Sequence, residues 1–294
     1  MGTILLATDF SKTSEKAYPL AAELAKKTDS KLLLVHILPH LLVDFAGAIS
    51  AIPVEALLEN DIKAIESEFT LHLNKEVFKG IEIEKLLVAE SNYNLLATFN
   101  EVEEQHEASL LIIGTDGVRS SHKSLAAKLV KVSAVPVITV GESVDNTKIE
   151  KITLATNFEN VNYKFLDNIW NIQKAFDAHL QILFVNTPLN FKETQVIENE
   201  YELFVNNYEL DNLSLHVYNA HQIEDGILKF VENENTDLLV LSTHGRKGLS
   251  DLLQKSYASY VVGHAKVPVY VYNMYNDKVY YNTISNIGLG SYYA

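Results

Sequence analysis

Apolar and polar positions along the chain follow two different periods. Five apolar runs in the first half have the length of buried strands; they are 3–7, 31–37, 83–88, 109–113 and 137–140. Between them, apolar residues recur every three to four positions, which is the spacing of a helix with one buried face. The clearest stripe is Ala17, Leu20, Ala21, Leu24 and Ala25, and further helices are expected at 53–73, 92–106 and 125–132. Strands that alternate with helices predict a parallel sheet with helices on both faces.

The same order begins again after a polar connection at 141–147. The segment Ile152–Phe158 echoes Ile4–Phe10, so that Asp9 and Asn157 are 148 positions apart, whereas Gly117 and Gly245 are 128 apart. The second copy is therefore shorter by about twenty residues, which we place between its second and third strands. Its later strands are expected at 180–185, 213–217, 238–241 and 269–272, with helices over 165–176 and 223–233. The chain thus predicts two α/β domains, 1–142 and 149–272, and a tail, 273–294, without a counterpart.

One strand of the second copy leads into a glycine-bearing loop. The run 239–242 is followed by Gly245 and Gly248, and then by a helix whose buried face is expected to hold Leu249, Leu252, Leu253, Tyr257, Tyr260 and Val261. Glycines allow backbone N–H groups to approach an anion, and the N-terminus of a helix adds partial positive charge. Glycines also serve loops for backbone reasons alone. The loop is a candidate phosphate site.

Composition narrows the class of protein. The net charge of −14 argues against a nucleic-acid backbone or an anionic membrane as the main partner. The chain has no cysteine, which excludes disulfides and fits a reducing compartment. The N-terminus has no signal-peptide pattern, and no apolar run reaches the ~18 residues of a membrane span. We expect a cytoplasmic protein.

With these segments the chain resembles a tandem universal stress protein. The resemblance rests on Ala-Thr-Asp-Phe-Ser at 7–11, Leu-Val-His-Ile at 34–37, Gly-Thr-Asp-Gly at 114–117 and Ser-Thr-His-Gly-Arg at 242–246, and on Val-Pro-Val at the end of each half. It implies two five-stranded parallel α/β domains of the Rossmann-like, adenine nucleotide alpha-hydrolase-like type. It also implies that they pack as a pseudo-dimer through their last strands, 137–140 beside 269–272, and the whole chain could pair further as a homodimer. We expect each copy of the fold to have its own sheet, so a single continuous sheet would count against a repeated fold.

The family has members that bind ATP and members that do not. The resemblance implies that binders hold the phosphates on a Gly-x-x-Gly-x₉-Gly-Ser/Thr loop and the adenosine near an Asp after the first strand and a Val in the second. In the first half Asp9, Ile37, Gly114, Gly117 and Ser124 occupy these positions. Only five residues separate Gly117 from Lys123-Ser124, where nine are expected. A loop this short favours a first half without ATP.

The second half keeps the full loop spacing. Nine residues lie between Gly245 and Lys255. The candidate contacts are Asn157, Val185, Ser242, Gly245, Arg246, Lys255 and Ser256. Three substitutions depart from the family pattern: Asn157 for Asp, which lacks charge assistance, and Ser242 and Lys255 for Gly. Lys255 can fill the phosphate space or pair with the phosphate. ATP or AMP is the expected ligand, with Mg²⁺ only alongside ATP.

Three functions remain open at this point. The favoured one is a stress-response signalling module that binds a nucleotide without turning it over. Slow ATP hydrolysis in the second half is the enzymatic alternative, although no residue resembles a water-positioning carboxylate. A partner-docking protein with neither half liganded is the third.

Other polar residues have simpler interpretations. Ten histidines show no metal-binding spacing, since His36 and His40 flank Pro39 in a strand-like stretch. His244 fits loop packing better than general-base catalysis. The acidic segment 101–107 is expected to be a solvated helix face.

Overall fold

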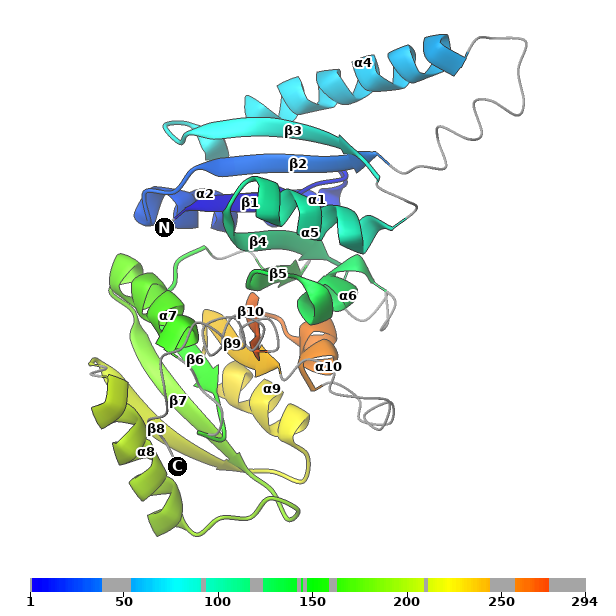
Figure 1. The fold of residues 1–294 in the computed structure, drawn as a ribbon. Helices are drawn as coiled ribbons and strands as arrows, with labels where there is room; N and C mark the ends of the chain where they lie inside the picture. The colour runs from blue at the N-terminus through cyan, green and yellow to red at the C-terminus, as the bar shows by residue number, and fades with distance from the viewer. Residues whose placement is uncertain are drawn as a thin grey trace, which may run out of the picture.

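Ten strands form one sheet with helices on both faces (Figure 1). The computed structural model describes residues 2–38, 54–90, 94–116, 124–141, 144, 147–158, 163–208, 211–243 and 257–274. The strand order is β3-β2-β1-β4-β5-β10-β9-β6-β7-β8. Each half thus contributes five strands, which follow the same order from the outer edge of the sheet to its middle. The predicted tandem repeat of one α/β fold is confirmed.

The elements of the two halves correspond in sequence. The first half consists of β1 (Thr3–Ala7), α1 (Lys12–Glu15), α2 (Tyr18–Lys27), β2 (Leu32–Leu38), α4 (Val54–Leu73), the 3₁₀ turn η1 (Glu76–Phe78), β3 (Ile83–Ala89), α5 (Leu95–Gln105), β4 (Ala108–Thr115), α6 (Leu125–Val132) and β5 (Val137–Gly141). The second consists of β6 (Lys151–Ala155), α7 (Tyr163–Phe176), β7 (His179–Asn186), α8 (Thr194–Tyr208), β8 (Leu213–Asn219), α9 (Ile223–Asn233), β9 (Leu238–Thr243), α10 (Tyr257–His264) and β10 (Val269–Asn273).

Strand register fixes which positions of the two copies are equivalent. Leu111 of β4 pairs with Leu5 of β1, and Leu239 of β9 pairs with Thr153 of β6. The first strands are therefore offset by 148 positions and the fourth strands by 128, as the sequence predicts. Gly114 consequently corresponds to Ser242 in space as well as in sequence.

The two halves are joined through their last strands. β5 and β10 run antiparallel, with Tyr270 opposite Ile138 and Val271 opposite Val137, and all four side chains are buried. The expected pairing of the last strands is confirmed. The expectation that a continuous sheet would speak against two copies is wrong, because pairing two edge strands itself makes the sheet continuous.

Two apolar layers cover the sheet, one on each face. One lies under α2, α4, α7 and α8, and the other under α5, α6, α9 and α10. Both layers contain residues of both halves, so the junction is part of the core and not a gap between two domains. No helix among the described residues is both long and apolar enough to cross a membrane.

Helix α8 has no counterpart in the sequence-based prediction. It corresponds to α4, because Phe204 of α8 packs edge-on against Phe158 as Phe69 of α4 does against Phe10. The shortened segment between the second and third strands therefore still carries a helix.

The acidic segment 101–107 was expected to be a solvated helix face. The structure contradicts this at one residue. Glu103 is 2% exposed, and its carboxylate accepts hydrogen bonds from Ser133 Oγ (2.7 Å) and Ala134 N (2.8 Å). Burial raises the pKa of Glu103, although these hydrogen bonds oppose the shift. The residue ties α5 to the turn between α6 and β5.

Candidate functional site

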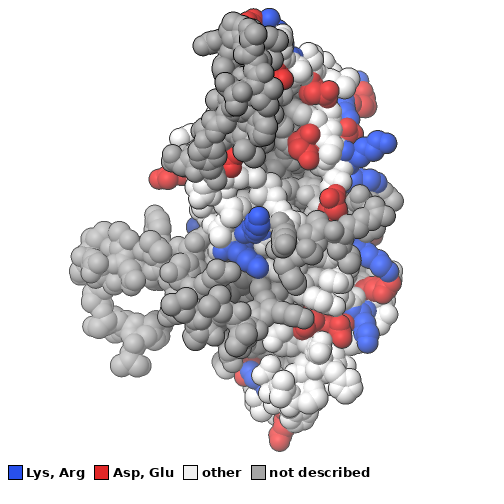
Figure 2. Space-filling view, turned by 90° about the vertical axis from the view of Figure 1, so that its right-hand side faces the viewer, with Lys and Arg blue, Asp and Glu red and all other residues white. Residues whose placement is uncertain are grey.

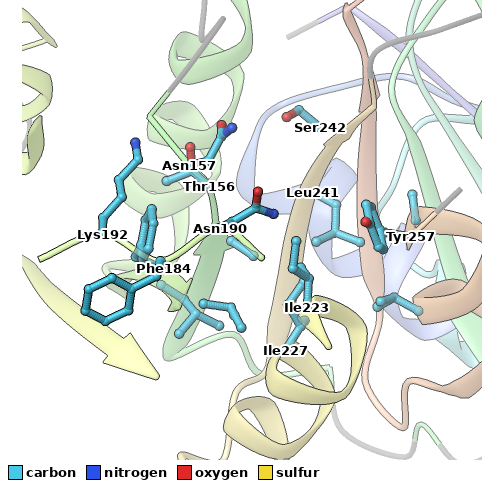
Figure 3. Close-up of a pocket in the computed structure, with 16 residues that line it drawn as sticks. Thr156, Asn157, Phe184, Asn190, Lys192, Ile223, Ile227, Leu241, Ser242 and Tyr257 are labelled. Atoms are coloured by element: carbon cyan, nitrogen blue, oxygen red, sulfur yellow. The ribbon is translucent and has the colours of Figure 1, made fainter. Parts of the chain in front are cut away.

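A pocket lies at the carboxyl ends of three strands of the second half. It has a volume of about 410 Å³. Its lining comes from β6, β7, β9, the loop after β7, α9 and α10 (Figure 3). The lining residues are Ala155, Thr156, Asn157, Leu183, Phe184, Val185, Asn190, Phe191, Lys192, Ile223, Ile227, Leu241, Ser242, Tyr257, Ala258 and Val261.

The topology explains why a pocket forms at this place. β6 lies between β7 and β9, so the chain leaves the first strand of the half on one side and returns on the other. The crossovers then depart in opposite directions and leave a crevice at the carboxyl edge, where ligands of doubly wound sheets bind.

A tight turn after β6 holds Asn157 at the rim. The backbone N–H of Phe158 donates to Thr156 Oγ1 (2.9 Å), and Phe158 adopts a left-handed conformation with φ of 65°. Its ring stacks on Phe184 with 6.0 Å between centroids. The same turn occurs in the first half, where Phe10 N donates to Thr8 Oγ1 (2.9 Å) and Phe10 has φ of 61°. A left-handed phenylalanine is unfavourable, and the stacking of its ring helps to hold it in both copies.

The apolar part of the pocket depends on a glycine in α9. A Cβ at Gly226 would lie 2.5 Å from Val185 Cγ1 and 2.9 Å from Ala220 Cβ. Because glycine has no Cβ, α9 can approach the end of β7 closely enough for Ile223 and Ile227 to line the cavity. Sequence reasoning did not single out Gly226, because a glycine inside a helix carries no signal of its own.

The loop after β7 is fixed by a buried amide. Asn186 Oδ1 accepts from Lys192 N (3.0 Å), and Asn186 Nδ2 donates to Lys192 O (3.1 Å). Asn190 N donates to the carbonyl oxygen of Thr187 (3.1 Å). The segment 187–192 is therefore held as a closed loop beside the pocket. Sequence reasoning missed this loop because it contains no family motif.

The described lining carries no uncompensated charge. Lys192 Nζ lies 2.8 Å from each carboxylate oxygen of Glu200. The same ammonium is 5.6 Å from the ring centroid of Phe184. No other described lining residue is charged, so this part of the pocket suits a neutral ligand portion such as a base or a sugar.

Three of the site residues expected in the second half meet in this pocket. Asn157, Val185 and Ser242 come from three different strand ends and line the same cavity. Gly245, Arg246, Lys255 and Ser256 lie outside the described residues, as do His244, Gly248, Leu249, Leu252 and Leu253. Tyr257 had been assigned to a buried helix face, and this is wrong. It is 48% exposed because it begins α10 at the edge of the pocket.

In the first half, a helix packs against the end of β4 at the equivalent position. A Cβ on Gly114 would lie 2.2 Å from the carbonyl oxygen of Thr13. Thr13 Oγ1 also donates to Asp116 Oδ1 (2.6 Å), which ties α1 to the end of β4. Gly114 thus makes room for α1 in this half. The residues 159–162, which follow β6 in the second half, lie outside the described residues.

The remaining first-half candidates have local roles. Asp9 Oδ1 accepts from Ser11 N (3.0 Å). Its pKa is lowered: burial alone would raise it, but hydrogen bonds from Ser11 and Ser14 outweigh burial. Ile37 is buried in the sheet, and Ser124 caps α6 by accepting from Ala127 N (3.0 Å). Gly117 lies outside the described residues.

Two buried hydroxyl groups and one histidine of the first half are joined by hydrogen bonds near the turn that follows β1. Tyr18 Oη lies 2.7 Å from Thr8 Oγ1 and 2.9 Å from His72 Nδ1, and all three residues are buried. Burial raises the pKa of Tyr18 to about 12. Burial lowers the pKa of His72, Lys75 adds to the lowering, and Glu15 and Glu68 oppose it.

This shift predicts a pH dependence of stability. Because the pKa of His72 is lower in the folded than in the unfolded chain, unfolding takes up a proton as the pH falls below about 6.5. The stability from neutral His72 is therefore full above that pH and is lost as the pH falls toward the folded-state pKa. Urea unfolding between pH 7.5 and 5.5 should show a smaller loss in His72→Asn than in the wild type. The exposed His221→Asn should behave like the wild type, and equal losses in all three would contradict the prediction.

The described histidines do not assemble a metal site. No group of three or more His, Asp or Glu side chains within the described ranges is placed to hold a metal ion. His36 instead stacks on Phe10 with 4.8 Å between centroids, and its Nδ1 lies 2.9 Å from the carbonyl oxygen of Thr8.

Comparison with solved structures identifies related folds. A universal stress protein from Archaeoglobus fulgidus DSM 4304 has a TM-score of 0.68 at 17% identity, covering 92% of this chain and 96% of that chain. A functionally unknown protein from Pseudomonas aeruginosa PAO1 has a TM-score of 0.62 at 16% identity, with 97% of both chains covered. A putative universal stress protein from Pseudomonas aeruginosa UCBPP-PA14 has a TM-score of 0.62 at 15% identity, again with 97% of both covered. No curated relative matches the chain in sequence.

The family assignment rests on a sequence model. The universal stress protein family model matches the chain twice, over residues 1–141 and again over 148–273. These two matches include all ten strands of the sheet. The chain therefore belongs to the universal stress protein family, with two copies of the family domain in tandem.

Proposed function

We propose that the second half of the chain binds an adenine nucleotide, ATP or AMP, in the pocket between β6, β7 and β9, as part of a stress-response signalling module. The observation that carries the proposal is the meeting of Asn157, Val185 and Ser242 in one cavity. The family resemblance assigns these positions to nucleotide contacts. They are far apart in the sequence and come from three different strands.

The shape of the pocket supports an amphipathic ligand. Figure 3 shows the polar ends of Asn157 and Ser242 on one side, with Ile223 and Ile227 on the other. An adenine base fits the aliphatic side, and a ribose fits the polar side, where Asn157 can bond a hydroxyl. Phosphate contacts are assigned to Arg246, Lys255 and Ser256.

The proposal concerns the second half only. In the first half α1 packs directly on Gly114, at the place where the family loop would approach a phosphate. The proposal contains no hydrolytic step, because the described lining holds no carboxylate that could position water. Among the described residues on the face drawn in Figure 2, both acidic and basic side chains are present.

Calorimetric titration tests the proposal and one of its contacts. We expect ATP or AMP to bind with a Kd of about 100 µM or tighter, equivalent to about −5.5 kcal/mol. Asn157→Asp should tighten adenosine binding about fivefold, because a carboxylate makes a charge-assisted bond to the ribose hydroxyl. Adenosine is used here because it has no phosphate for the new carboxylate to repel.

The first half supplies the matched control. Asp9→Asn makes the reverse change at the equivalent position and should leave binding unaltered. No heat from ATP or AMP at protein concentrations well above 100 µM would overturn the proposal. If Asp9→Asn alone changed binding, the ligand would belong to the first half.

A further inference from the structure

Asn190 lines the pocket with an exposed carboxamide side chain. Figure 3 shows its amide between Phe184 and Leu241, on the boundary between the polar rim and the aliphatic side. The side chain comes from the loop after β7 and not from any of the family's motif positions. Nothing in the sequence distinguishes it from the other asparagines of the chain.

The backbone of Asn190 is held while its side chain stays available. Asn190 N donates to the carbonyl oxygen of Thr187 (3.1 Å) and lies 3.3 Å from Thr187 Oγ1. Asn186 binds both backbone groups of Lys192, two residues further on. Within the part of the chain that the structure describes, the carboxamide of Asn190 makes no hydrogen bond. The backbone is therefore positioned beforehand, and the donor and the acceptor of the side chain are free to bind a ligand.

Hydrogen-bonding chemistry indicates what this group would recognise. A carboxamide presents one acceptor and one donor side by side. Adenine presents the complement, because its 6-amino group donates next to the N7 acceptor, and asparagine pairs with both at once. Hypoxanthine carries two neighbouring acceptors, O6 and N7, on the same edge, so one carboxamide can satisfy only one of them.

We propose that Asn190 is the specificity-determining residue of the second-half pocket and reads the 6-amino and N7 edge of adenine. This inference rests on the proposed nucleotide function and deepens it. The neutral lining supports it, since Lys192 is already paired with Glu200. Selectivity for the base then comes from hydrogen-bond geometry and not from charge.

Comparison of AMP with IMP tests the inference, because the two ligands share sugar and phosphate and differ in the base. Calorimetry of the wild type should give a preference for AMP of roughly 10- to 100-fold in Kd. Asn190→Ala should weaken AMP and bring the ratio close to one. Asn190→Asp should weaken both ligands and keep a preference for AMP, because a carboxylate still accepts from the amino group and repels O6.

The control and the overturning results are distinct. Leu189→Ala changes a neighbouring side chain of the same loop that is 94% exposed and does not line the pocket, so it should leave both constants unaltered. If Asn190→Ala weakens AMP and IMP equally, the residue contacts the sugar and the inference is wrong. An unchanged ratio with unchanged affinity overturns it as well, while the proposed function stands. If the wild type binds neither ligand, the proposed function and this inference both fail.

Discussion

Replacing Gly114 with alanine is expected to lower the free energy of unfolding by about 3 kcal/mol. The backbone at this position does not need a glycine, because Gly114 is not among the residues with positive φ. The space is what excludes a side chain. The new Cβ would lie 2.2 Å from the carbonyl oxygen of Thr13 and 2.9 Å from Ser14 Cα. These are backbone atoms of α1, so they cannot rotate away, and the helix must leave the end of β4.

Urea unfolding measures this effect, and a second glycine gives the control. Gly263 lies inside α10, where an added Cβ would meet nothing within 4 Å. Gly263→Ala should raise stability by about 0.5–1 kcal/mol, because alanine is the better helix former. If Gly114→Ala is as stable as the wild type, α1 does not need to pack on β4. Its AMP affinity should be unchanged, since the proposed pocket belongs to the other half.

The strands of this fold were predictable because of their burial. A parallel strand covered on both faces consists almost entirely of apolar residues, and it reads as a continuous run rather than an alternation. Both 109–113 and 238–241 have this character, and they form the fourth strands of the two halves. The repeat added the pairing of equivalent positions, which strand register bears out.

Not every element was predicted. In helix α8 Ile197 and Phe204 are buried, and Tyr201 and Val205 pack against the same apolar layer. These four positions have helical spacing, so the sequence carries a pattern for this helix that the prediction omitted. Glu103 stands in an acidic segment that looks solvated. Its partners, Ser133 and Ala134, are thirty residues further along the chain, and only tertiary structure brings them together.

The sequence predicted some residues of the candidate site and missed others. The family motif named Asn157, Val185 and Ser242, and these residues share a cavity. It named nothing in the loop after β7, where Asn190 lies. Gly114 shows a further limit. A glycine that admits a phosphate and a glycine that admits a helix both need only the absence of Cβ, so the sequence could not distinguish these two roles.

Proline at position 271 is expected to be the most damaging single change at the junction of the two halves. Val271 pairs with Val137 of β5 on one side and with Leu241 of β9 on the other, and it is 1% exposed. Proline removes one ladder N–H and places its ring inside a closed sheet, so we expect a loss of about 3–5 kcal/mol. The melting temperature should fall by roughly 10 °C.

An edge strand provides the comparison for this prediction. Val217 lies on β8 at the edge of the sheet, pairs with β7 alone and is 37% exposed, so Val217→Pro should cost less. In Val271→Pro, amide hydrogen exchange should accelerate in β5 as well as in β9, because both strands lose a partner although they belong to different halves. Unchanged melting, or faster exchange confined to β9, would mean that the halves are stable apart. The physical reason to expect otherwise is that both apolar layers run across the junction, so an interruption there exposes core residues of both halves at once.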